Sequence, residues 1–318
     1  MARKVLIVGG TGFIGPHLAR RLLDEGARVR VVSRRGAAGL DPWKVRMLEG
    51  AEIGSLDMTD IFQLSSAMDE VDTVVHAASV SKSRNSDLAM EQDIDVNLKG
   101  TLTIMRAAGA AKVRRVVYLS SAGTVYGQGA DAPYAETDAC VPISSYGIVK
   151  LAAENYVSLL GGSFGVSSLI LRVSNPLGAG QTGADGQGIA AVFYRLLMKG
   201  AEARIFGDGL AERDYLRVED AMRAACELMK MDAEGIYNIA SGRSFTILDV
   251  VEALEAATGR TLARTSIKPS RPADVGHIRV DVSKAEGALG WRPDGNLKQI
   301  IADYVAWADK HIGDAGQG

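Results

Sequence analysis

Cysteine, net charge and long apolar runs are all scarce in this sequence. Its 318 residues include 2 cysteines, Cys140 and Cys226, whose spacing fits no metal or redox motif, so we expect inert thiols. The formal net charge of −2 gives no electrostatic footprint for nucleic acid. No stretch approaches the roughly eighteen apolar residues of a membrane span, and the N-terminus lacks an apolar signal segment. These absences predict a cytoplasmic protein with no disulfide, metal, membrane or nucleic-acid partner.

What is present is an alternation of apolar runs and helical patterns in the first half. Apolar runs that predict strands cover residues 5–8, 29–32, 73–76, 113–119 and 168–171. Helices are predicted between them at residues 17–25, 61–68, 92–108 and 146–160. Strands that alternate with helices predict an α/β fold with a doubly wound (Rossmann) parallel sheet.

The second half is less regular and predicts a smaller C-terminal α/β domain that binds substrate. Helices are expected at residues 186–199, 219–231, 246–258 and 296–311, a strand at 235–239, a glycine-rich loop at 176–183 and a frayed tail at 313–318. We expect a dinucleotide-binding domain at residues 1–175, to which residues 214–240 return. Residues 176–213 and 241–318 would form the second domain.

The first predicted strand leads directly into the segment Gly9-Gly10-Thr11-Gly12-Phe13-Ile14-Gly15. Glycine lets the backbone turn tightly and approach a pyrophosphate, and the following helix offers free N–H groups and a partial positive charge. Strand, glycine pattern and helix together predict a dinucleotide site. Cofactor contacts are expected from Gly9, Gly12, Phe13, Ile14 and Gly15.

Tyr146 and Lys150 stand four residues apart on a predicted helix, so both side chains can enter one pocket. We expect the Lys150 ammonium to lower the pKa of Tyr146 from its usual ~10, which suits proton exchange with a sugar hydroxyl. Ser121 and Thr124 follow the end of another predicted strand, where open α/β sheets place their ligands. A hydroxyl there would orient the reacting oxygen.

The order of short segments along the chain resembles the extended short-chain dehydrogenase/reductase family, in its NAD-dependent sugar epimerase/dehydratase branch. The resemblance runs from about Val5 to Trp307 and rests on the segments GGTGFIG, HAAS, SSAGTVYG, YGIVK, LRVSNPLGAGQ, IFGDG, RDYLRVEDA, YNIASG, RPADV and LGWRP. It implies a nucleoside-diphosphate sugar bound against NAD(P). It also implies a homodimer formed through the helices predicted at residues 92–108 and 146–160.

The same resemblance implies roles for individual residues. Tyr146 would be the acid and base, and Lys150 would hold the nicotinamide ribose. Further cofactor contacts are implied for Leu56, Asp57, Ala77, Ala78 and Asn97. Contacts with the sugar nucleotide are implied for Asn175, Arg213, Arg271 and Asp274, and guanidinium groups suit its diphosphate.

Two positions depart from the family's pattern. Ala122 stands where epimerases of this type often carry Ser or Thr, so either Thr124 or Ser121 supplies the hydroxyl or the chemistry is weaker or different. Ser33 stands where NAD-using relatives commonly place an acid on the ribose 2′-hydroxyl. The segment Ser33-Arg34-Arg35 favours NADP slightly over NAD, and a solvated basic loop is the alternative interpretation.

The favoured hypothesis is C4 epimerisation of the sugar through a transient 4-keto intermediate, with Tyr146 removing the C4 proton. No Thr-Asp-Glu triplet occurs around Thr124, which argues against a dehydratase. An NADPH-dependent reductase of a 4-keto-6-deoxy sugar nucleotide would use the same Tyr146–Lys150 pair and stays an alternative. A non-catalytic nucleotide-sensing protein of this fold is the other alternative, although a sensor would not need a proton-transfer pair.

Overall fold

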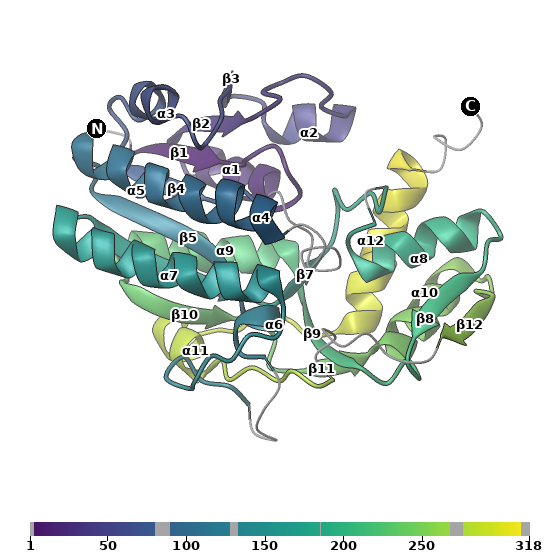
Figure 1. Cartoon of the computed structure of the whole chain (residues 1–318). Coiled ribbons are helices and arrows are strands. Elements are labelled where there is room, and N and C mark those ends of the chain that lie inside the picture. The colour runs from purple at the N-terminus through teal and green to yellow at the C-terminus, as the bar shows by residue number, and fades with distance from the viewer. Residues whose placement is uncertain (1–2, 80–89, 128–132, 185, 268–275, 313–318) are drawn as a thin grey trace.

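Seven parallel strands form the central sheet of the computed structural model, which describes residues 3–79, 90–127, 133–184, 186–267 and 276–312 (Figure 1). Their order is β3-β2-β1-β4-β5-β6-β10. The strands are β1 (Lys4–Val8), β2 (Arg28–Ser33), β3 (Glu52–Ser55), β4 (Thr73–His76), β5 (Arg115–Ser121), β6 (Ser167–Val173) and β10 (Gly235–Ile239). The order reverses between β1 and β4, and open α/β sheets bind ligands at such a switch point.

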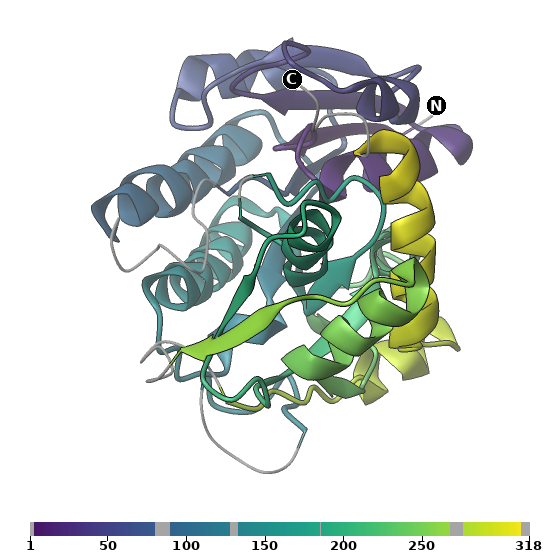
Figure 2. The same ribbon diagram turned by 90° about the vertical axis from the view of Figure 1, so that its right-hand side faces the viewer.

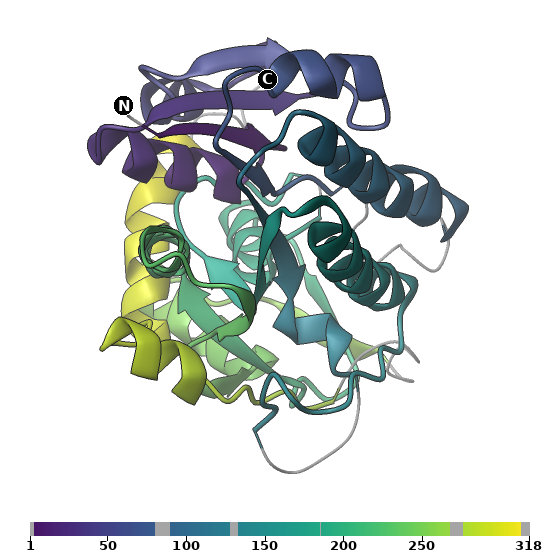
Figure 3. The same cartoon turned by 90° about the vertical axis from the view of Figure 1, so that its left-hand side faces the viewer.

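Helices cover both faces of this sheet, as the end-on view in Figure 3 shows. One face carries α1 (Ile14–Asp24) and α9 (Val218–Lys230), with α11 (Ser283–Leu289) beside α9 and β10. The other face carries α3 (Ile61–Ala67), α5 (Lys99–Ala110) and α7 (Ser145–Phe164). Alternate residues of β1 enter the two cores: Val5 and Ile7 face α1, while Leu6 and Val8 face the other helices. A strand buried on both faces is a continuous apolar run, which is why these strands are visible in the sequence.

The smaller unit is built around a third core next to the sheet's carboxyl edge (Figures 1 and 2). A three-stranded sheet contains β7 (Asn175–Leu177), β9 (Glu212–Arg217) and β11 (Ser244–Thr246), and β8 (Ala203–Phe206) pairs with β12 (Arg264–Ile267). The helices are α8 (Ile189–Met198), α10 (Ile247–Thr258) and α12 (Leu297–His311). Trp307 of α12 packs edge-on to Trp43 of α2 (Pro42–Met47), so the smaller unit contacts the N-terminal half directly.

The predicted fold class is confirmed, and the differences concern short elements. β3, α2, α11 and the strands β7, β8, β9, β11 and β12 were not predicted, because each is short and contains polar residues or glycine. The predicted helix at residues 92–108 is divided: Asp93–Leu98 form a π-helical turn after α4 (Met90–Gln92), and α5 begins at Lys99. The predicted tail at residues 313–318 lies outside the described residues.

The helix predicted from residue 186 begins only at Ile189. Gly186 and Gly188 have φ of 77° and 75°, a left-handed conformation that a right-handed helix cannot include. Within the ranges given above, no helix has the length and apolar character needed to cross a membrane.

Candidate active site

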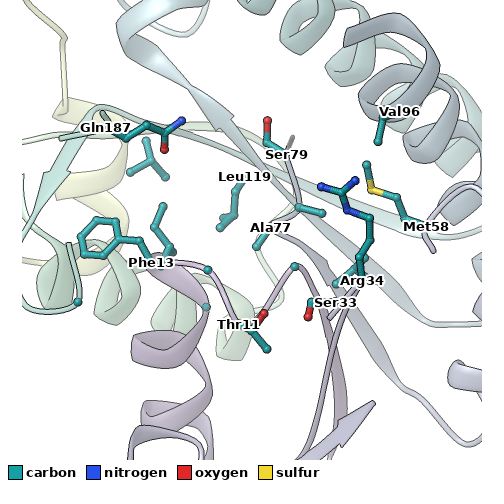
Figure 4. A pocket seen from close by; sticks show the side chains of 18 of the residues that line it. Thr11, Phe13, Ser33, Arg34, Met58, Ala77, Ser79, Val96, Leu119 and Gln187 are labelled. Atoms are coloured by element: carbon teal, nitrogen blue, oxygen red, sulfur yellow. The ribbon is translucent and has the colours of Figure 1, made fainter. Parts of the chain in front are cut away.

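A cavity of about 570 Å³ opens at the carboxyl ends of β1, β2, β4 and β5. Figure 4 shows Arg34, Met58 and Val96 at one end of it, Phe13 and Gln187 at the other, and Leu119 and Ser79 between them. The predicted residues that line it are Gly9, Gly12, Phe13, Ile14, Gly15, Ser33, Arg34, Leu56, Asp57, Ala77, Ala78, Tyr146 and Lys150. Segments far apart in the sequence therefore share one cavity at the switch point of the sheet.

The glycine-rich turn between β1 and α1 is shaped by two close approaches. A Cβ on Gly9 would lie 2.4 Å from Ala78 Cα, and one on Gly15 would lie 2.3 Å from the Gly10 carbonyl oxygen. A Cβ on Gly12 would meet nothing nearer than 3.5 Å, since Gly12 faces the cavity. The backbone is thus bare where the cavity meets the start of α1, and the partial positive charge of that helix end attracts anions.

Ser33 ends β2 at the rim of the cavity. Its hydroxyl oxygen is buried and has no hydrogen-bond partner among the described residues. Arg34 lines the cavity next to it, whereas Arg35 is exposed and lies outside the lining. The structure therefore brings Ser33 and Arg34 to the cavity, and it does not bring the predicted Arg35 there.

Leu56, Asp57 and Met58 form the wall beyond β3. The Asp57 carboxylate accepts hydrogen bonds from the Thr59 backbone N–H at 2.9 Å and from the Thr59 hydroxyl at 2.8 Å. These bonds lower the pKa of Asp57, and the charge of Arg34 acts in the same direction. Met58 and Val96 add apolar surface at the same end of the cavity as Arg34 (Figure 4) and were not predicted, because a lone Met or Val carries no sequence signal.

Tyr146 and Lys150 project from the first turns of α7, where the Ser144 hydroxyl accepts a hydrogen bond from the Gly147 N–H at 3.2 Å. The Lys150 ammonium donates to the Leu119 carbonyl oxygen at 2.8 Å. It lies 4.8 Å from the ring centroid of Tyr118 and 5.7 Å from that of Tyr146. Both catalytic candidates thus line the cavity together.

The predicted direction of the Tyr146 pKa shift is wrong for this structure. Burial, together with the negative charge of Asp93, raises the pKa of Tyr146 to about 12. Burial also lowers the pKa of Lys150 to about 8, and Glu154 opposes that shift. Desolvation of the buried phenol is the largest effect on the pKa of Tyr146, and it acts against the predicted lowering.

The hydroxyls predicted after β5 are not in the cavity wall. Ser121 and Thr124 lie outside the lining, and the Thr124 hydroxyl points back to the Ser121 carbonyl oxygen at 3.5 Å. Ser120 lines the cavity instead, and its hydroxyl donates to the Glu154 carboxylate. Leu119 and Ser120 are the residues of β5 that line the cavity, and the sequence did not show at which residue of β5 the cavity ends.

Asn97 lies beneath the cavity and not in its wall. It is buried, its side-chain amide donates to Asp93 at 3.2 Å, and its carbonyl accepts from Thr101. The buried Asp93 also accepts from Ser145 at 3.0 Å, which ties the π-helical turn to the start of α7. Asn97 was predicted as a cofactor contact, whereas Asp93 and Ser145 were not, because these two residues lie 52 positions apart in the sequence.

The structure describes two of the four residues that were predicted to contact the sugar nucleotide. Asn175 on β7 donates to the Asp214 carbonyl at 2.9 Å, and Arg213 on β9 donates to the Glu212 carbonyl at 2.7 Å. Both belong to the three-stranded sheet, and neither lines the cavity. Arg271 and Asp274 lie outside the described residues.

The glycine-rich loop after β7 closes the other side of the cavity. Its residues Gly180, Gln181, Thr182 and Gly183 line the wall together with Gln187 and with Lys44 of α2, and none of these was predicted. His17 of α1 anchors the loop through a 2.8 Å hydrogen bond to the Ala179 carbonyl. Gly180 is needed there because a Cβ would lie 2.6 Å from the Trp43 ring.

The doubly wound sheet holds in one cavity a glycine turn, a Tyr–Lys pair and, at the end of β2, a hydroxyl without a partner among the described residues. Together they define a dinucleotide-dependent protein of the short-chain dehydrogenase/reductase type. Residues 5–240 match the model of the NAD dependent epimerase/dehydratase family, and the chain belongs to this family. The predicted family membership is thereby confirmed.

Relatives and solved structures extend the match over nearly the whole chain. A putative UDP-glucose 4-epimerase of Methanocaldococcus jannaschii is 30% identical over 304 residues, covering 95% of this chain and 97% of the relative. The UDP-glucose 4-epimerase of Thermotoga maritima, solved with UDP-glucose, has a TM-score of 0.89 at 28% identity and covers 97% and 99% of the two chains. That of Thermus thermophilus, in complex with NAD, has a TM-score of 0.87 at 29% identity and covers 96% and 98%.

Proposed function

We propose that this chain is a UDP-sugar 4-epimerase with a tightly held nicotinamide dinucleotide. The observation that carries the proposal is that Tyr146 and Lys150 line the same cavity as the bare glycine turn. The relatives named UDP-glucose 4-epimerase support the choice of reaction and of the uridine nucleotide. The carboxyl edge of the sheet, next to the smaller unit, is where the sugar would meet this pair.

The residues present fit such a cofactor. The bare surface at Gly12 leaves room for a pyrophosphate beside the start of α1, and the Ser33 hydroxyl has a free hydrogen-bonding capacity at the ribose end. Leu56 and Met58 offer an apolar wall for an adenine ring. When bound, the cofactor supplies a hydride acceptor and donor for C4 of the sugar.

In the proposed mechanism Tyr146 exchanges the proton of the C4 hydroxyl. Because burial raises the pKa of Tyr146 to about 12, its phenolate needs a positive charge nearby. Lys150 supplies that charge while it is protonated, and its hydrogen bond to Leu119 keeps it beside the Tyr146 ring. The protonation state of Lys150 therefore controls how easily Tyr146 takes and returns the proton.

We propose that the sugar nucleotide is contacted by Asn175, Arg213, Arg271 and Asp274. Asn175 and Arg213 stand on neighbouring strands, which supports a shared role. We propose that the hydroxyl that orients the reacting oxygen belongs to Thr124 or Ser121, because the fully buried Ala122 has no hydroxyl group. Steady-state rates of Thr124→Ala and Ser121→Ala, with Thr124→Ala expected to be slower, test this choice.

For the cofactor we propose that NADP binds at least as well as NAD. Ser33 introduces no negative charge that would repel a 2′-phosphate, and Arg34 stands beside it at the cavity. Arg35 is a weaker candidate because it is exposed outside the lining.

The direct test mixes the purified protein with UDP-glucose and follows UDP-galactose formation by NMR. Formation that is lost in Tyr146→Phe supports the proposal. Net consumption of NADPH with a 4-keto-6-deoxy sugar nucleotide, without epimerisation, would replace it by the reductase alternative. Nucleotide binding without any turnover would favour the sensor.

We further propose a homodimer, a cytoplasmic location and the predicted division into two domains. Apolar side chains exposed on α7, namely Ile148, Tyr156 and Leu159, support a helical dimer interface, which light scattering would test. Both cysteines are free, which is consistent with a reducing compartment. β10 at the edge of the large sheet and α9 on its face support the return of residues 218–240, and α11 accompanies them, whereas residues 214–217 belong to β9 of the three-stranded sheet.

A further inference from the structure

Glu154 is a buried carboxylate that the proposed mechanism does not use. It stands on α7 one turn after Lys150 and is 2% exposed. Arg172 of β6 pairs with it: Nη2 lies 2.8 Å from Oε2, and Nε lies 3.2 Å and 3.1 Å from the two carboxylate oxygens. A buried ion pair of this kind contributes little to stability compared with apolar packing. Its position beside the cavity therefore suggests a role other than stabilising the fold.

Ser120 connects this pair to the wall of the cavity. Ser120 and Arg172 are register partners on the neighbouring strands β5 and β6, and both reach the Glu154 carboxylate. The residue before Ser120, Leu119, accepts the hydrogen bond of Lys150 at 2.8 Å. Consecutive residues at the end of β5 therefore hold two successive turns of α7.

Arg172 is itself held in place from the other side. It donates to the Tyr126 hydroxyl at 3.0 Å, and its guanidinium lies 4.9 Å from the Tyr126 ring centroid. The Tyr126 hydroxyl donates to Asn238 of β10 at 2.7 Å. Glu154 thus sits on a fixed support that extends across β5, β6 and β10.

The charged and titratable groups around Lys150 come from three elements. His76 of β4 is buried and neutral, because burial and Lys150 lower its pKa to about 3. Tyr118 of β5 and Tyr146 of α7 present their rings to the ammonium. Glu154 is the carboxylate whose charge raises the pKa of Lys150 against the effect of burial.

We propose that Glu154 is a positioning residue, which through Ser120 and Arg172 fixes α7 against the sheet and keeps Lys150 charged beside Tyr146. This inference deepens the proposed epimerase function and rests on it for its catalytic consequence. Glu154 itself would touch neither cofactor nor sugar. Its effect on the reaction passes through the charge and the place of Lys150.

The experiment measures the pKa of Lys150 by NMR in protein labelled with ¹³C at lysine Cε, with its signal assigned from Lys150→Met. In Glu154→Gln we expect this pKa to fall by about one unit, because an opposing charge one helical turn away is removed. The alkaline limb of the kcat profile for UDP-glucose should move to lower pH with it, with KM changed less than kcat. Glu154→Asp should restore most of the shift.

The matched control is Ser168→Ala. The Ser168 hydroxyl of β6 also bonds α7, at the Val157 carbonyl 3.1 Å away, but toward the end remote from the cavity. Its loss should leave the pKa of Lys150 and the pH profile unchanged. If Glu154→Gln does not fold because Arg172 is left unpaired, the double variant Glu154→Gln with Arg172→Met is measured in the same way.

An unchanged pKa of Lys150 in a folded variant without the carboxylate overturns the inference. It is equally overturned if Ser168→Ala shifts that pKa as much as Glu154→Gln does. Should the wild-type protein epimerise no UDP-sugar, the proposed function fails, whereas the NMR titration still decides whether Glu154 controls the charge of Lys150.

Discussion

The cofactor end of the site and its proposed sugar end, the three-stranded sheet with Asn175 and Arg213, are built in different ways. At the cofactor end, the chemistry comes from short continuous segments, since Gly9 to Gly15 form one turn and Tyr146 and Lys150 share one helix face. At the sugar end, Asn175 and Arg213 stand on different strands around Asp214. The fully buried Asp214 carboxylate accepts from Ser241 N–H at 2.9 Å and Gly242 N–H at 2.8 Å, which connects β9 to the turn after β10.

This difference indicates how each end responds to substitution. A side chain at the cofactor end acts directly on the cavity, so its loss should appear in binding or turnover of the cofactor. A side chain at the sugar end depends on strands that meet only in the folded chain. Variants at the two ends should therefore affect the two ligands separately, and the following predictions test that separation.

The largest effect is expected for Tyr146→Phe. The ring keeps its shape and packing, but the proton-transfer group is lost, so kcat should fall roughly 10²–10⁴-fold with little change in thermal stability. Endpoint assays with UDP-glucose measure kcat, and thermal melts measure the stability. Turnover near the wild-type rate would remove Tyr146 from the mechanism.

The glycine turn offers a matched pair in Gly15→Ala and Gly12→Ala. Gly15→Ala forces a Cβ within 2.3 Å of the Gly10 carbonyl oxygen. It should lower the free energy of unfolding by about 1–3 kcal/mol and also weaken cofactor binding. In Gly12→Ala the new Cβ lies no nearer than 3.5 Å to another atom, so the variant should keep its stability and show only weaker cofactor binding. Chemical denaturation and NADH titration separate these outcomes, and equal destabilisation of both variants would contradict the geometry.

At the proposed sugar end, Arg213→Ala should weaken UDP-sugar binding and leave cofactor binding intact, and the resemblance predicts the same result for Arg271→Ala. Hydrogen bonds to a charged diphosphate contribute about 1.5–3 kcal/mol, which is roughly a 10- to 150-fold change in affinity. Calorimetry with UDP-glucose and with NADH measures both. If cofactor affinity falls together with sugar affinity, the two ends are not independent.

The smallest effect is expected for Arg34→Ala at the rim of the cofactor end. The side chain is exposed and its charge is screened, so NADPH affinity should fall by a few-fold, about 1 kcal/mol or less, while NADH affinity stays constant. Arg35→Ala is the control, since Arg35 lies outside the cavity, and it should change neither affinity. A wild-type preference for NADH that Arg34→Ala leaves unchanged would reject the 2′-phosphate proposal.

Much of the cofactor end was predictable because its signals are local. The apolar run of β1, the glycine spacing and the Tyr–Lys spacing each depend on residues within one turn or one strand. Lys44, Gln181 and Gln187 were missed, because a loop or short helix from elsewhere brings them to the cavity. Ser120 was missed in favour of Ser121, because the residue at which β5 leaves the cavity wall depends on the folded structure.

The sequence by itself determined the doubly wound sheet and the Tyr146–Lys150 pair, because periodicity and spacing act over a few residues, and the resemblance of its ordered segments indicated the family. The tertiary structure alone decided the pKa of Tyr146, which burial raises although a lysine stands one turn away. It also decided the contact between Trp43 and Trp307 and the junction of Ser120, Glu154 and Arg172. Desolvation and contacts between distant strands depend on how the whole chain is packed, and no local pattern records them.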